Sequence, residues 1–90
     1  NGFAEECNNK EILDAIILLA KTEGIFTEPA GGVSISILQK MVEQGKIDKN
    51  DRIVCYVTGN GLKATESIME VLEKPKVMNA DIAEISAVIN

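Results

Sequence analysis

The chain has 90 residues, a formal net charge of −5 and no histidine, and only 3% of its residues are aromatic. Ninety residues form one domain at most. The acidic, aromatic-poor composition argues against a nucleic-acid partner, which needs basic and stacking side chains. The lack of histidine excludes histidine-based zinc sites and histidine-activated nucleophiles, so we predict no metal site. No apolar run approaches the ~20 residues of a membrane span and no signal peptide is visible, so we expect a cytoplasmic protein without a membrane partner.

The first predicted element is a helix over about residues 9–23. Asn8 or Asn9 can cap its first turn, in which Glu11 lies, and Gly24 can adopt the left-handed conformation that ends a helix. Apolar residues cover most of the circumference of this helix, which predicts burial on more than one side.

Three further helices are predicted. One spans about residues 30–44, with Pro29 in a position that suits the start of a helix. The next spans about residues 65–73, where Thr65 can cap the first turn. The last spans about residues 80–89, and its apolar residues are expected to face inward: Ile82, Ile85, Val88 and Ile89.

Short strands are predicted at about residues 25–27 and 52–58, with 76–78 as a further candidate. The run from 52 to 58 is almost continuously apolar, which suits a central strand that is covered on both faces. Cys55 within it is interpreted as a small buried apolar side chain rather than half of a disulfide. Two or three short strands make a poor sheet. We therefore predict an α/β fold in which residues 1–90 form a single segment of a larger three-layer domain with parallel strands.

Two glycine-containing segments carry the candidate site residues. Gly59, Asn60 and Gly61 follow the long apolar strand, and such strand-to-helix turns let backbone approach a ligand closely. If the first two predicted strands are parallel neighbours, Glu28 and Thr58 lie just beyond their carboxyl ends, where open α/β sheets bind ligands. The pattern predicts one wall of a small-molecule site.

The residues alone leave other interpretations of these segments open. The turn lacks the Walker pattern G-x-x-x-x-G-K-[ST], and it meets the dinucleotide fingerprint only loosely, with alanine at the third glycine position and Asp81 as the acid. An ordinary tight turn, and a plain helix start at Glu28, fit the same residues. Gly31 and Gly32 are costly in a helix start, which indicates close contact with another segment or a ligand. Lys63 is either a solvated lysine or a phosphate contact.

Three segments form a recognisable combination: EILDAI at residues 11–16, TEGIFTEPAGGV at 22–33 and YVTGNGLK at 56–63. Together they resemble the carboxyl-terminal part of threonine synthase, a pyridoxal-phosphate enzyme of the superfamily that includes the tryptophan synthase β chain. The resemblance covers about residues 8–75, and the two glycine-containing segments together are characteristic of threonine synthase and cysteate synthase. Ala64 departs from the Asp or Thr that often follows Leu-Lys in the family.

The resemblance implies pyridoxal phosphate as the cofactor of a lyase of threonine biosynthesis, which converts O-phospho-L-homoserine and water to L-threonine and phosphate. It implies that the Thr58 hydroxyl bonds the pyridine nitrogen, that Gly59, Asn60 and Gly61 shape the floor beside the ring, and that Glu28 lies near the cofactor. The family's Schiff-base lysine and phosphate-binding loop lie in segments that do not occur here. We therefore expect no catalytic residue in this segment and an inactive isolated chain. The expected partners are the rest of the enzyme, a small-molecule substrate and a second copy.

Two alternatives stay open. A related pyridoxal-phosphate enzyme, such as cysteate synthase or a serine/threonine dehydratase, would be distinguished by substrate-binding residues upstream. A stand-alone binding or assembly module would instead fold alone and unfold cooperatively, without dependence on the cofactor. The first residue is not Met, which favours a processed or truncated piece.

Overall fold

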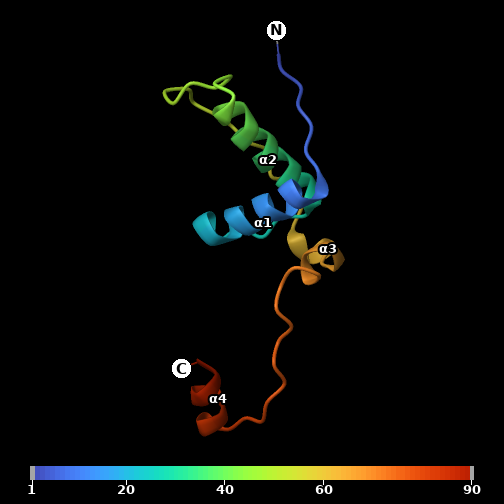
Figure 1. Ribbon diagram of the computed structural model, residues 1–90, viewed down its shortest axis with the longest axis vertical. Helices are drawn as coiled ribbons and strands as arrows, with labels where there is room; N and C mark the ends of the chain where they lie inside the picture. Colours follow the sequence, from blue (N-terminus) through green and yellow to red (C-terminus); the bar gives the residue numbers. More distant parts are fainter. Residues whose placement is uncertain (1, 90) are drawn as a thin grey trace.

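The computed structural model of the chain describes residues 2–89, which are organised mainly as helices (Figure 1). The elements in chain order are α1 (Asn9–Glu23), α2 (Pro29–Glu43), the 3-10 turn η1 (Gly61–Lys63), α3 (Glu66–Met69) and α4 (Ile82–Ile89). The described residues form no strand, and one isolated antiparallel bridge joins Thr27 and Asn60. None of the helices in this range is long and apolar enough to cross a membrane.

Helix α1 has the predicted boundaries because both of its ends carry local signals. Asn8 Oδ1 accepts a hydrogen bond from the backbone N–H of Glu11 at 2.9 Å, and the Glu11 carboxylate accepts one from the Asn8 N–H at 2.8 Å. This reciprocal capping box satisfies N–H groups that the start of a helix leaves free. At the other end Gly24 has a φ of 68°, the left-handed conformation that stops the helix.

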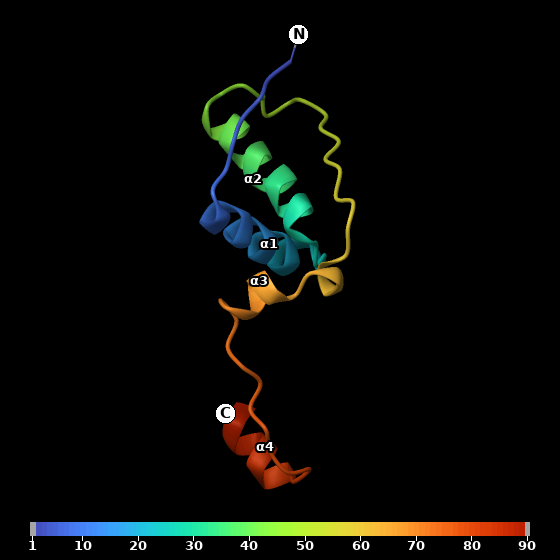
Figure 2. The same ribbon diagram turned by 90° about the vertical axis from the view of Figure 1, so that its right-hand side faces the viewer.

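Helix α1 packs across α2, and a glycine lets the two helices approach closely (Figure 2). A Cβ atom on Gly32 of α2 would lie 2.7 Å from Ile16 Cγ1 and 2.9 Å from the carbonyl oxygen of Ile12, both in α1. Helix α2 begins at Pro29 and agrees with the predicted range to within one residue at each end. The buried apolar side chains of the described residues are Ala15, Ile16 and Leu19 of α1 and Ile68 of α3.

The predicted strand over residues 52–58 does not form. The segment is an extended chain between α2 and η1 (Figure 2), and Val54 and Tyr56 within it are each 79% exposed. A strand needs hydrogen-bonded neighbours, and a central strand needs packing on both faces; residues 2–89 supply neither. For the same reason Cys55 is half-buried rather than buried.

The two shorter predicted strands are also absent. Residues 76–78 are exposed and are not assigned to a strand. Within residues 25–27, Thr27 makes the bridge to Asn60, and this bridge is antiparallel rather than parallel as predicted. The predicted parallel strand–helix–strand unit is therefore wrong for residues 2–89, because the segments that meet there run in opposite directions.

The two C-terminal helices are shorter than predicted. Helix α3 has four residues, and Thr65 makes no side-chain capping bond to it. Helix α4 begins at Ile82, which is 84% exposed, and none of its residues is buried, so the predicted inward face is wrong. An extended segment carries α4 away from α1 and α2 (Figure 1). The radius of gyration is therefore 17.2 Å, whereas a compact domain of this length has about 12 Å.

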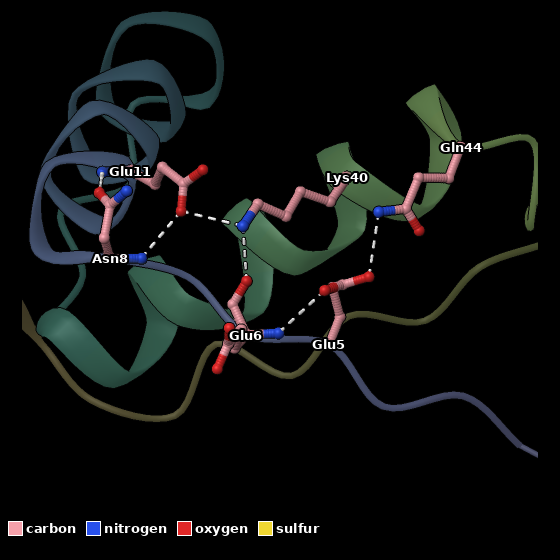
Figure 3. A network of polar contacts seen from close by, with 6 residues as sticks. All are labelled: Glu5, Glu6, Asn8, Glu11, Lys40 and Gln44. Atoms are coloured by element: carbon pink, nitrogen blue, oxygen red, sulfur yellow. Dashed lines mark hydrogen bonds and ion pairs between the residues drawn. The ribbon is translucent and has the colours of Figure 1, made fainter.

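The N-terminal segment lies along α2 through polar contacts (Figure 3). Lys40 Nζ donates a hydrogen bond to the Glu6 carbonyl oxygen at 2.6 Å and pairs with the Glu11 carboxylate at 3.0 Å. Gln44 Nε2 donates to the Glu5 carboxylate at 3.0 Å. Lys40 thus joins the first turn of α1, the residues before it and the second half of α2.

Candidate functional site

The two glycine-containing segments meet in space. The Glu28 N–H donates to the Gly59 carbonyl oxygen at 3.0 Å, and the Gly61 N–H donates to the Phe26 carbonyl oxygen at 3.0 Å. These two hydrogen bonds form the antiparallel bridge that attaches the turn before η1 to the start of α2. The turn is therefore fixed to the best-packed part of the molecule.

The glycines give room for close contact where the two segments touch. A Cβ atom on Gly59 would overlap the carboxylate of Glu28, and one on Gly61 would lie 2.5 Å from two ring atoms of Phe26. Gly31 is packed equally tightly against a threonine hydroxyl. Gly31 therefore contacts Thr27 of its own segment, whereas Gly32 makes the contact with another segment, α1, that the sequence predicts.

The side chain of Glu28 lies between the two segments. Glu28 occupies the N-cap position of α2, but its carboxylate does not cap the helix. Its Oε2 instead lies 3.1 Å from Lys63 Nζ of η1, and the Glu28 side chain is only 17% exposed. Lys63 itself is 69% exposed, so it is a solvated lysine that also forms an ion pair.

Four of the five predicted site residues lie together in this arrangement: Glu28, Gly59, Asn60 and Gly61. Asn60 Oδ1 accepts a hydrogen bond from the N–H two residues further on, at 2.9 Å, and so caps η1. Thr58 directly precedes the turn, and its side chain is exposed. The Thr58 hydroxyl is therefore available to a ligand, whereas the Asn60 side chain already has a structural role.

Two residues of this arrangement were not predicted. Thr27 is 1% exposed, and its hydroxyl donates to the Gly59 carbonyl oxygen at 3.1 Å. Phe26 is half-buried beneath Gly61. Neither residue could be recognised from the sequence near it. A threonine or a phenylalanine in a short β-prone stretch carries no local pattern that predicts its burial against a distant turn. In residues 2–89 no group of three or more Cys, Asp or Glu residues is placed to hold a metal ion.

A protein-family model described as "Pyridoxal-phosphate dependent enzyme" matches residues 1–59 of the chain, which is more than half of its length. The chain belongs to this family. The match includes Glu28, Thr58 and Gly59 and ends before Asn60 and Gly61. The predicted resemblance is thus confirmed, and so is pyridoxal phosphate as the cofactor on which the family depends.

Several relatives are named threonine synthase. The relative from Methanocaldococcus jannaschii is 41% identical over 88 residues, which are 98% of this chain and 22% of the relative. The relative from Halalkalibacterium halodurans is 43% identical over 82 residues, which are 90% of this chain and 23% of the relative. The relative from Bacillus sp. strain ULM1 is 48% identical over 63 residues, 70% of this chain and 18% of the relative. The chain spans about a fifth of the length of these curated relatives.

Proposed function

We propose that this chain is the carboxyl-terminal part of a threonine synthase-type enzyme that converts O-phospho-L-homoserine and water to L-threonine and phosphate. The observation that carries the proposal is the exposed Thr58 hydroxyl, which lies inside the family match and beside a turn fixed to α2. The relatives named threonine synthase cover both glycine-containing segments. In this proposal the rest of a longer cytoplasmic enzyme, which acts as a homo-oligomer, supplies the Schiff-base lysine and the phosphate-binding loop.

The residues of this chain fit one part of such a cofactor site. An exposed hydroxyl can donate a hydrogen bond to the pyridine nitrogen. The space beside Gly59 and Gly61 is filled by Glu28 and Phe26, so in this proposal the packed turn itself forms the floor beside the ring. Pyridoxal phosphate, when bound, supplies the electron sink for the reaction. The Thr58 proton stays on its oxygen, because a hydroxyl is a far weaker acid than a pyridinium ion. The ring nitrogen is therefore less positively charged than it would be beside an aspartate. The Glu28 carboxylate is packed against Gly59, next to Thr58 in the sequence.

The proposal is tested by Thr58→Ala and Thr58→Ser in the full-length protein that contains this chain. The alanine variant is expected to lower kcat for phosphate release by about tenfold or more, because a hydrogen bond to the cofactor is lost. It should also shift the absorption band of the bound cofactor, and the serine variant should restore both properties. Thr22→Ala, in an exposed part of α1, is the matched control.

Two results would contradict different parts of the proposal. Unchanged turnover and an unchanged spectrum in Thr58→Ala would remove the role of Thr58. If the unaltered protein releases no phosphate from O-phospho-L-homoserine but forms a keto acid from serine or threonine, the substrate assignment is replaced by that of a dehydratase.

A further inference from the structure

Among the described residues, Thr27 has the one buried side chain that makes a hydrogen bond to the turn beside Thr58, which consists of Gly59 and Asn60. Thr27 is 1% exposed, and its Oγ1 lies 3.1 Å from the Gly59 carbonyl oxygen and 3.3 Å from that of Glu28. The Glu28 carbonyl oxygen already accepts from the N–H groups of Gly31 and of the next residue, at 3.0 and 3.2 Å. The Thr27 hydroxyl therefore makes its better hydrogen bond to the Gly59 carbonyl oxygen, which is closer and accepts fewer other bonds.

The packing around Thr27 restricts the movement of this hydroxyl. A Cβ atom on Gly31 would overlap Thr27 Oγ1, so the first turn of α2 closes one side of the side chain. Two donors, the Thr27 hydroxyl and the Glu28 N–H, then meet the same carbonyl oxygen of Gly59. The direction of that carbonyl is fixed from a buried point at the start of α2.

This fixation matters because Gly59 directly follows Thr58. Glycine has more backbone freedom than any other residue, so the backbone on either side of Gly59, including the peptide group whose carbonyl Thr27 holds, has little preferred direction of its own. An error of about 1 Å in the place of a group that contacts the reacting centre can cost a large part of the rate. The turn therefore needs an external restraint if Thr58 is to hold one position.

We propose that Thr27 is a positioning residue for Thr58: its buried hydroxyl fixes the Gly59 carbonyl and thereby the direction in which Thr58 presents its own hydroxyl. The proposal rests on the proposed function, since it concerns the contact between Thr58 and the pyridine ring. It gives Thr27 no contact with cofactor or substrate.

The test uses Thr27→Val in the full-length protein, because valine keeps the shape of threonine and removes only the hydroxyl. The expected result is a fall in kcat of about tenfold with little change in KM, because the contact is needed at the reacting cofactor rather than for substrate binding. The absorption band of the bound cofactor should shift in the same direction as in Thr58→Ala. Thr27→Ser, which keeps the hydroxyl, is expected to restore the spectrum. Thr22→Val on α1 makes the same substitution at an exposed hydroxyl and should leave it unchanged.

A double-variant cycle separates positioning from a structural role. If Thr27 acts through Thr58, Thr27→Val should shift the cofactor spectrum when it is the only substitution. In a protein that already carries Thr58→Ala, the same substitution should cause no further shift. Equal changes in both backgrounds, or no change in either, would overturn the proposal. Should the valine variant fail to fold, comparison of Thr27→Ala with Thr27→Ser gives the same decision.

The cycle also keeps the two proposals apart. A Thr58→Ala variant with an altered spectrum, beside a Thr27→Val variant with none, removes the positioning role and leaves the proposed function in place. A silent Thr58→Ala variant removes the role of Thr58, and the positioning role falls with it, whereas the proposed reaction is tested separately by phosphate release from O-phospho-L-homoserine.

Discussion

Glycines mark the points at which this chain brings its own segments closest together. Gly32 admits a side chain and a carbonyl of α1, Gly59 admits the Glu28 carboxylate, and Gly61 admits the ring of Phe26. These neighbouring groups differ in how easily they could move away from an added methyl group. A carboxylate at the end of a flexible side chain can rotate away, whereas a ring held between segments cannot. Substitution should therefore be tolerated at Gly59 better than at Gly61.

Gly61→Ala is expected to destabilise the folded protein by about 1–3 kcal/mol, the usual cost of overpacking. Its new methyl group would lie 2.5 Å from Phe26 Cδ2 and Cε2, and the Gly61 N–H is tied to the carbonyl of the same phenylalanine at 3.0 Å. Urea unfolding of the protein that contains this chain measures the effect. Gly2→Ala, where the added Cβ meets nothing within 4 Å, is the control. Equal unfolding midpoints for both variants would contradict the prediction.

At the scale of elements, the start of α1 and the second half of α2 are joined by charge. The pKa of Glu11 is lowered from 4.5, first because the Asn8 N–H donates to its carboxylate and then because Lys40 lies beside it. The same carboxylate raises the pKa of Lys40. A hydrogen bond from Gln44 is the main cause of the lowered pKa of Glu5. The pairing of Glu11 with Lys40 and the contact of Glu5 with Gln44 therefore depend on ionised carboxylates, whereas the bond from Lys40 to the Glu6 carbonyl does not.

Glu11→Gln is expected to lower the melting temperature at neutral pH, and the difference from the unaltered protein should shrink as the pH falls below 4.5. A carboxyl group with a lowered pKa in the folded state contributes stability above its unfolded pKa, and this stability is lost as the pH falls through the folded pKa. Melting curves recorded from neutral to acidic pH measure the effect. Glu23→Gln, at the exposed end of α1, is the control. A difference that does not vary with pH would refute the electrostatic explanation.

Elements with local signals could be predicted from the sequence, and elements that need distant partners could not. The ends of α1 follow from Asn8 and Gly24, which act within a few residues. The apolar run over residues 52–58 has the composition of a central strand, but a strand forms only against neighbours that residues 2–89 lack. Glu28 and Thr58 were expected at one site through parallel strands, which would also have brought Gly59 to Glu28. Glu28 and Gly59 are instead adjacent through an antiparallel bridge. No local sequence pattern distinguishes antiparallel from parallel pairing of two such short segments.

The whole molecule is elongated and leaves much apolar surface exposed. Its extents are 59 × 26 × 19 Å. Large apolar side chains are exposed in the segment before η1, in the segment between α3 and α4 and throughout α4, among them Val54, Tyr56, Val77, Ile82 and Ile89. Exposed apolar groups of this kind mark surfaces that are covered by other parts of a protein or by partners. This distribution supports the proposal that the chain completes its core within a longer enzyme.

Residues 1–90 expressed alone are therefore expected to self-associate and to bind a hydrophobic dye such as ANS, and to unfold without a sharp transition. The physical reason is that the unpaired extended segment and α4 offer backbone and apolar groups to other copies. Light scattering after size-exclusion chromatography and a urea titration measure these properties. The full-length protein serves as the control and should unfold cooperatively. A monomeric isolated chain with a sharp transition would favour a stand-alone module instead.

The hydrogen bond from Thr27 to Gly59 spans 32 positions of the sequence, and from this separation we expect an order of folding. Helices α1 and α2 are joined by a short connection and can pair early, since closing a short loop costs little chain entropy. The turn beside Thr58 can dock only after the whole of α2 and the extended segment behind it have been brought back. During synthesis and refolding, we therefore expect the turn that carries the proposed cofactor contact to be assembled after the helical scaffold that supports it.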